Sequence, residues 1–150
     1  MKHEQLTVRE ITADDRSDYL TMASEFYSSP AVLHDIPRSY IEDTFRELTN
    51  GSVHAKALIA LSGGKPAGYI LLALTWSQEA GGKVVWIDEI YVRQEARGLG
   101  IGSALMNEAV SRFPAARVRL EVEHDNTAAR RLYERLGYKD LPYMQMYTGN

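Results

Sequence analysis

Cysteine is absent from this sequence of 150 residues. Its absence excludes disulfide bonds, thiolate metal ligands and cysteine nucleophiles. Long apolar segments are absent too: the longest, Tyr69 to Leu74, is far shorter than the roughly 20 residues of a membrane-spanning helix. The chain begins with Lys2, His3 and Glu4, and no apolar signal segment follows them. We therefore expect a protein without a membrane partner, located in the cytoplasm.

An excess of basic charge is missing as well. The 17 Lys and Arg residues against 20 Asp and Glu residues give a formal net charge of −3. Nucleic-acid-binding proteins usually show a dominant basic patch, so we do not expect a nucleic acid as partner. No group of His, Asp and Glu residues has the spacing of metal ligands, so we expect no metal.

What is present is a regular succession of strand and helix periodicities. The length fits one domain, residues 1–150, and no linker, repeat or low-complexity tract divides it. Apolar spacing and turn residues predict strands at 5–11, 54–61, 66–76, 83–93, 118–122 and 143–147, and helices at 12–28, 37–49, 100–113 and 126–136. The order β-α-α-β-β-β-α-β-α-β predicts an α/β fold with a mixed sheet and helices on its faces.

A glycine-rich turn, Arg-Gly-Leu-Gly-Ile-Gly-Ser at residues 97–103, lies between a predicted strand and a predicted helix. The first-turn N–H groups of a helix have no intrahelical acceptors, and glycines let a phosphate approach them, so the turn predicts a pyrophosphate site. A dinucleotide fingerprint would need glycine in place of Ser103, and a P-loop would need a lysine where none lies between Lys83 and Lys139. A flexible turn that merely precedes a helix remains the alternative.

These residues resemble a known family. Arg97-x-x-Gly100-x-Gly102 is similar to the Arg/Gln-x-x-Gly-x-Gly/Ala motif of the GNAT acetyltransferases, and 86–92 resembles the strand that precedes it. Asn126-x6-Tyr133, followed by Leu-Gly-Tyr at 136–138, resembles the second motif of that family. The resemblance covers about residues 54–140, and 75–92 is most similar to the spermidine/spermine (diamine) N-acetyltransferases.

The resemblance implies an acetyl-CoA-dependent N-acetyltransferase that acts on a small primary amine, and it makes a homodimer plausible. It also implies pairing of the strand backbone with the pantetheine arm of the cofactor. The implied cofactor-binding residues are Ile90, Tyr91, Val92, Arg97, Gly98, Leu99, Gly100, Ile101, Gly102, Ser103, Asn126 and Tyr133. A protein N-terminal or lysine acetyltransferase and a non-catalytic acetyl-CoA sensor are the alternatives.

Tyr133 is the candidate general acid. A phenol with a pKa of about 10 is a reasonable proton donor to a thiolate whose acid has a pKa of about 8.5. Asn126 lies seven residues earlier, on the same helix face and about 10.5 Å away along the axis. Core packing of Tyr133 and helix capping by Asn126 are the structural alternatives.

Asp88 and Glu89 are the candidate bases, because they interrupt an otherwise apolar strand. Adjacent strand residues point to opposite faces, so only one faces the amine unless the strand bulges. Asp88 occupies the position of the proposed base in the diamine acetyltransferases, where it is a glutamate. Ion pairing with Arg93, Arg97 or a loop lysine is the alternative role.

Four further residues are candidates for contact with the acceptor substrate, because they lie where the first helices and the third strand would enclose it. These are Glu25, Tyr27, Tyr40 and Trp76. Packing in the core is their alternative role.

Overall fold

The structure is a computed structural model in which residues 5–32 and 34–150 are described; the charged start of the chain, residues 2–4, lies outside them. Its centre is a five-stranded sheet in the order β1-β2-β3-β4-β5. The strands are β1 (Leu6–Glu10), β2 (Ala55–Ser62), β3 (Lys65–Ser77), β4 (Gly82–Val92) and β5 (Arg117–Leu120). The first three pairings are antiparallel and the pairing of β4 with β5 is parallel, so the predicted mixed sheet is confirmed.

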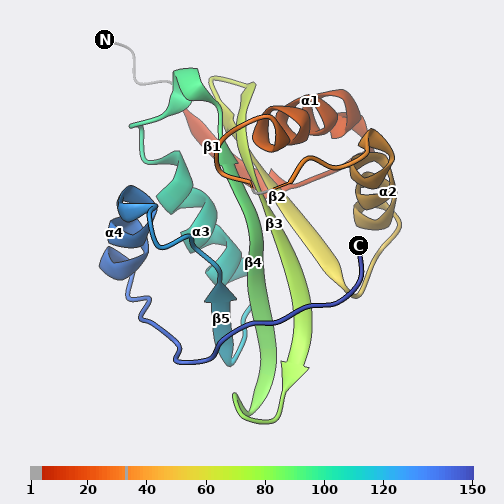
Figure 1. Ribbon diagram of the computed structural model, residues 1–150. Coiled ribbons are helices and arrows are strands. Elements are labelled where there is room, and N and C mark those ends of the chain that lie inside the picture. Colours follow the sequence, from red (N-terminus) through yellow and green to blue (C-terminus); the bar gives the residue numbers. More distant parts are fainter. Residues whose placement is uncertain (1–4, 33) are drawn as a thin grey trace.

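Helices cover both faces of this sheet (Figure 1). The helices α1 (Arg16–Tyr27) and α2 (Arg38–Thr49) lie on one side, and α3 (Ile101–Arg112) and α4 (Thr127–Arg135) on the other. Short 3-10 turns, η1 (Ala13–Asp15) and η2 (Gln94–Ala96), precede α1 and the glycine turn. Among the described residues, no helix is long and apolar enough to cross a bilayer.

The central strand β3 explains the longest apolar run of the sequence. Its side chains alternate between two cores, with Tyr69 and Leu71 packed under α1 and α2, and Ile70 and Leu72 under α3. All four are buried because helices cover both faces, and a strand covered on both sides needs apolar residues at consecutive positions.

A β-bulge interrupts β4 at Asp88. Leu71 pairs with Glu89 and Leu72 pairs with Ile87, so Asp88 is the extra residue between them. The bulge shifts the alternation of side chains by one position. Ile87 and Ile90 therefore both face the α3 core, although they are three residues apart.

The strands β4 and β5 diverge just beyond this bulge. Their pairing runs only from Val84 opposite Arg117 to Ile87 opposite Leu120, while β4 continues to Val92. For this reason β5 ends at Leu120 and not at residue 122, as predicted. The divergence opens the sheet at the level of Asp88, which is where the candidate site lies.

The predicted last strand, residues 143–147, is wrong. This segment is irregular and belongs to none of the strands in the described part of the chain. A strand needs a partner for its backbone groups, whereas the N–H of Tyr143 bonds locally to the carbonyl of Leu141 at 2.9 Å. Met144 and Met146 are 88% and 91% exposed, so no apolar face holds the segment to the sheet.

Candidate active site

The glycine turn has the backbone conformation of an anion site. Gly98 and Gly100 have φ values of +80° and +78°, in the left-handed region, and Gly100 is the N-cap of α3. Glycine adopts this region at no steric cost, whereas a Cβ there is strained. The first N–H groups of α3 therefore start directly at an exposed turn without side chains in the way.

Two contacts place this turn at the end of β4. The Nε of Arg97 donates a hydrogen bond to the carbonyl oxygen of Val92 at 3.1 Å. A Cβ at Gly102 would lie 4.0 Å from side-chain atoms of Val92 and Leu132, which is ordinary contact. The start of α3 is thus packed between β4 and α4, and position 102 has room for a methyl group.

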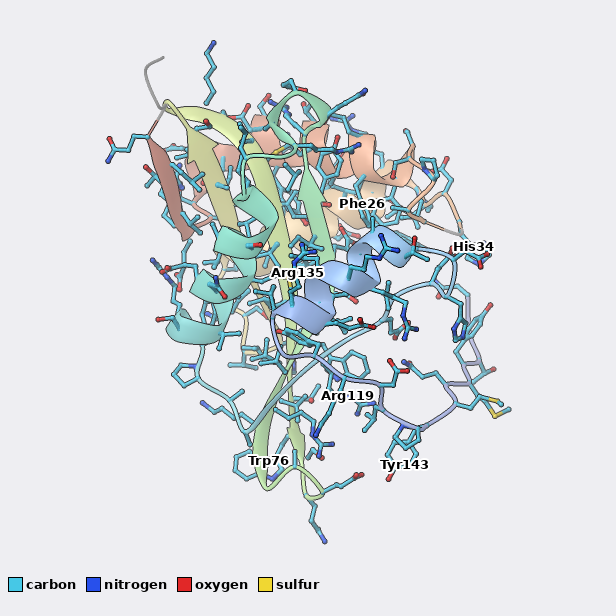
Figure 2. The ribbon with its side chains drawn as sticks, turned by 90° about the vertical axis from the view of Figure 1, so that its left-hand side faces the viewer. Phe26, His34, Trp76, Arg119, Arg135 and Tyr143 are labelled. Atoms are coloured by element: carbon cyan, nitrogen blue, oxygen red, sulfur yellow. The ribbon has the colours of Figure 1, made fainter. Side chains whose placement is uncertain are left out.

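A cavity of about 640 Å³ opens where β4 and β5 diverge. Its walls come from β4, from the chain after β5, from α4 and from the end of α1. The lining residues are Phe26, Pro30, Ala31, Ile87, Asp88, Glu89, Ile90, Leu120, Glu121, Val122, Glu123, Asp125, Asn126 and Tyr133. In Figure 2, Phe26 lies near the first residues of α4, and Arg135 marks the other end of this helix. Five residues proposed from the sequence meet in this cavity: Asp88, Glu89, Ile90, Asn126 and Tyr133.

Asn126 both caps α4 and faces the cavity. Its side-chain oxygen accepts a hydrogen bond from the N–H of Ala129 at 3.2 Å, which is an N-cap interaction. The capping expected from the sequence is therefore confirmed. The two predicted roles of Asn126 are compatible in space.

Tyr133 lies seven residues after Asn126, near the other end of α4. It is half-buried against the α3 core, and its ring centroid lies 6.2 Å from that of Tyr138. Burial raises the pKa of its phenol above the ordinary value, so the group is protonated at neutral pH. Core packing and an orientation toward the cavity occur together.

Asp88 faces the cavity from the bulge. Asp88 lines the cavity, and partial desolvation of its carboxylate is the main reason why its pKa is raised. The negative charge of Glu121 across the cavity raises the pKa of Asp88 further. Neither of the ion pairs expected from the sequence, with Arg93 or Arg97, is among the ion pairs of the described residues.

Glu89 is held by two tyrosines. The hydroxyl of Tyr27 donates a hydrogen bond to its Oε2, and the hydroxyl of Tyr69 donates to its Oε1 at 2.8 Å. Burial raises the pKa of Glu89, and the two hydrogen bonds act in the opposite direction. Both oxygens of this carboxylate thus already accept a hydrogen bond, unlike those of Asp88.

A second acid–tyrosine pair joins the same two elements next to the first. The hydroxyl of Tyr91 donates to Glu25 at 2.7 Å, and the Nε of Arg93 lies 3.5 Å from the same carboxylate. Burial and the bond to Glu25 raise the pKa of Tyr91 to about 12. Glu25 therefore fastens α1 to β4 and does not line the cavity.

Three other residues proposed as substrate contacts lie outside the cavity lining. Tyr27 is not part of the lining, and its hydroxyl donates a hydrogen bond to Glu89, which is. Tyr40 lies on α2, where its hydroxyl accepts a hydrogen bond from Asn150 at 3.3 Å. Trp76 is 74% exposed at the far end of β3, well away from Phe26 (Figure 2).

The charge of the cavity lining has one sign. It contains the carboxylates of Asp88, Glu89, Glu121, Glu123 and Asp125 and, among the described residues, no lysine or arginine. No set of three or more His, Asp and Glu side chains in residues 5–32 and 34–150 is arranged to hold a metal ion. The arrangement can therefore attract a positively charged group to the bulge.

Several residues at the site were not predicted from the sequence, among them Tyr69, which bonds to Glu89, and Glu121 in the cavity lining. Tyr69 lies within a buried apolar run and showed no signal that distinguishes its hydroxyl. Glu121 lies at the end of a short predicted strand, and nothing in the sequence indicates that β4 and β5 diverge beside it. Its alternation with Glu123 after a short strand was the only available hint.

Residues 16–138 match the sequence model of the acetyltransferase (GNAT) family. An uncharacterized N-acetyltransferase of Methanocaldococcus jannaschii is 29% identical over 139 residues, which make up 89% of this chain and 61% of that protein. This chain thus spans about three fifths of the length of that relative.

Two solved structures share the fold over nearly the whole chain. A possible acetyltransferase from Clostridium difficile superposes with a TM-score of 0.82 at 22% identity, covering 98% of each chain. An aminoglycoside N-acetyltransferase in complex with CoA has a TM-score of 0.81 at 15% identity, covering 99% of this chain and 97% of that one. Because the match to the family extends over residues 16–138, the protein belongs to the GNAT acetyltransferase family.

Proposed function

We propose that this GNAT acetyltransferase transfers the acetyl group of acetyl-CoA to the primary amine of a small molecule, such as a polyamine, a diamine or an amino-acid-like compound. The main support is the cavity between β4 and β5, where the carboxylate of Asp88 and the phenol of Tyr133 line one space. One group that accepts a proton and one that donates a proton are what acyl transfer to an amine requires.

The glycine turn and the adjoining strand fit the cofactor. The turn offers backbone N–H groups at a helix N-terminus, so we propose that residues 97–103 hold the pyrophosphate of coenzyme A. Ile90, Tyr91 and Val92 lie beyond the pairing with β5, and among the described residues no strand covers that edge of β4. Their backbone is available to the pantetheine arm, and Asn126 faces the same cavity. Acetyl-CoA, when bound, supplies the acetyl group as a thioester.

Asp88 is the proposed base. An amine substrate arrives as an ammonium and must lose a proton before it attacks. The raised pKa of Asp88 makes this carboxylate a better proton acceptor than an ordinary aspartate, and Asp88 lines the cavity. Asp88 takes up the proton directly or through a water molecule.

Tyr133 is the proposed acid. Its phenolic oxygen holds a proton at neutral pH, because burial raises its pKa. Tyr133 lies on α4 and lines the cavity from the side of the α3 core, while Asp88 lines it from β4. The acid and the base therefore come from different elements on the two sides of the same space.

The acceptor is proposed to be cationic. Five carboxylates in the lining make the cavity attractive to an ammonium group and unattractive to an anion. Proteins that share one fold can act on different substrates, so the fold alone does not identify the acceptor amine. We further propose that residues 1–150 act as one catalytic domain in the cytoplasm. We also propose that the protein is a homodimer, and size-exclusion chromatography with light scattering can test this oligomeric state.

The test is turnover with a panel of amines. Release of free CoA from acetyl-CoA is followed with diamines, polyamines, amino acids, an aminoglycoside, and peptides with free N-termini or lysines. We expect turnover with at least one small amine above the rate of acetyl-CoA hydrolysis without acceptor, and its loss in the double variant Asp88→Asn/Tyr133→Phe.

Two results would contradict the proposal. Turnover with peptides alone would replace the acceptor class by a protein N-terminus or a lysine. Tight binding of acetyl-CoA without turnover of any amine would make the protein a sensor of the cofactor.

A further inference from the structure

The hydrogen bonds of Glu89 connect the bulged strand to the end of α1. Tyr27 is the last residue of α1, and its hydroxyl bonds to one oxygen of Glu89. Tyr69, on β3, bonds to the other oxygen. We call these three side chains the Tyr27–Glu89–Tyr69 latch.

One end of the latch is fixed by the core. Tyr69 is fully buried, its ring lies 5.2 Å from that of Tyr19, and its backbone pairs with that of Tyr91 in the sheet. A buried hydroxyl in so crowded a place has few alternative positions. Tyr69 therefore fixes the orientation of the Glu89 carboxylate.

The other end of the latch carries a wall of the cavity. Phe26, Pro30 and Ala31 line the cavity, whereas Tyr27 does not. The rings of Phe26 and Tyr27 are in edge contact, with centroids 5.1 Å apart. A shift of Tyr27 would thus move Phe26 and the chain that follows α1, which face Asp88 across the cavity.

We propose that Glu89 is a positioning residue and not the base: through Tyr27 it holds the Phe26–Ala31 wall at the distance that the acceptor amine requires. This inference rests on the proposed acetyltransfer, and it concerns the acceptor alone. The latch controls the KM for the amine, and leaves kcat and the binding of acetyl-CoA unchanged. Each oxygen of Glu89 accepts a hydrogen bond from a tyrosine, whereas within the described part of the chain no hydrogen bond engages the carboxylate of Asp88.

The first test uses Glu89→Gln, Tyr27→Phe and the double variant. Glutamine cannot act as a base, and its NH2 cannot accept a hydrogen bond, so one of the two tyrosine hydroxyls loses its acceptor. We expect each single variant to raise the amine KM roughly tenfold, with kcat within about twofold of the wild-type value. The double variant should raise KM no further, because both changes break the same connection.

The matched control is Tyr19→Phe, which removes a hydroxyl from the same helix but leaves the latch intact. It should change the amine KM by less than about twofold. A fall in kcat of about 100-fold or more in Glu89→Gln would make Glu89 the base and overturn the inference. Additive effects in the double variant, or an unchanged KM in both single variants, would overturn it as well.

A second measurement does not depend on turnover. Hydrogen–deuterium exchange of residues 26–32 should be faster in Glu89→Gln and in Tyr27→Phe than in Tyr19→Phe, because the end of α1 is released. Unchanged exchange in both latch variants would refute the latch, even if the amine panel supports acetyltransfer. Faster exchange in a protein that turns over no amine would leave the latch in place and refute the proposed function.

Discussion

The two faces of the sheet use different chemistry. On the face of α3 and α4, the glycine turn and the unpaired edge of β4 offer backbone groups, and the side chains around them are mainly apolar. On the face of α1 and α2, tyrosine hydroxyls and carboxylates bond to each other, as in Tyr27 with Glu89 and Tyr91 with Glu25. The cavity lies between the two, at the divergence of β4 and β5.

This difference corresponds to two tasks. A phosphate and an amide-containing arm can be held by backbone N–H and C=O groups, which any sequence provides once the turn is formed. A particular amine has to be recognised by side chains of stated charge and position. We therefore expect changes on one face to affect the donor and changes on the other face to affect the acceptor.

The largest expected effect comes from Asp88→Asn. Loss of the base should lower kcat/KM for the amine by about 100-fold or more, while the Kd of acetyl-CoA stays within about twofold. Steady-state kinetics and calorimetry measure the two quantities. Asp125→Asn, at the rim of the same cavity, is the control and should change kcat/KM by less than about threefold. Equal losses in both variants would mean that Asp88 contributes only charge.

Next in size is Tyr133→Phe. It keeps the ring in the core but removes the proton, so kcat should fall at least about tenfold with the affinity for acetyl-CoA retained. Tyr138→Phe makes the same change on the neighbouring ring and should leave kcat within about twofold. Unchanged turnover in Tyr133→Phe would remove this residue from the acid role.

On the face of α3 and α4, Gly100→Ala should weaken the binding of acetyl-CoA and leave the binding of the amine unchanged. A Cβ at φ +78° costs about 1–2 kcal/mol and turns the N–H groups of the turn away, so the Kd of acetyl-CoA should rise roughly tenfold. Gly102→Ala adds the same methyl group at a position that has room for it, so this variant should bind acetyl-CoA with unchanged affinity. If both variants bound alike, the conformation of the turn would not be what holds the cofactor.

The smallest expected effect is a shift in the pH profile. Activity that depends on an ionised base is lost as the pH falls through the pKa of that base, and the pKa of Asp88 is raised by burial and then by Glu121. Glu121→Gln removes the second cause only. The acid limb of kcat/KM should therefore move to lower pH. A move to higher pH would show that Glu121 does not face Asp88 with a negative charge.

The same contrast decides what could be predicted from the sequence. The glycine turn and the Asn126 cap depend on residues within a few positions of each other, so their patterns are visible in the sequence. On the face of α1 and α2, the tyrosine–carboxylate hydrogen bonds join residues that are separated by 62, 20 and 66 positions in the sequence. Nothing in the local pattern around Tyr27, Tyr69 or Tyr91 indicates a carboxylate partner.

The strand errors have a related cause. The alternation along β4 was readable, but whether Asp88 and Glu89 share a face depended on a bulge, and one extra residue leaves no mark in the apolar pattern. The segment 143–147 has strand-like residues, but strand formation depends on a partner edge that lies elsewhere in the chain. Periodicity therefore predicted the order of the five paired strands, and it also predicted a sixth strand that has no partner edge among the described residues.

The central claim is that the face of α3 and α4 binds acetyl-CoA independently of the acceptor face. Calorimetric titration of the wild type, Gly100→Ala and Asp88→Asn with acetyl-CoA tests it most directly. We predict one site per chain in the wild type, the same affinity in Asp88→Asn, and weaker binding in Gly100→Ala. No detectable binding to the wild type at about millimolar ligand, a Kd above the usual range for enzyme ligands, would contradict the account.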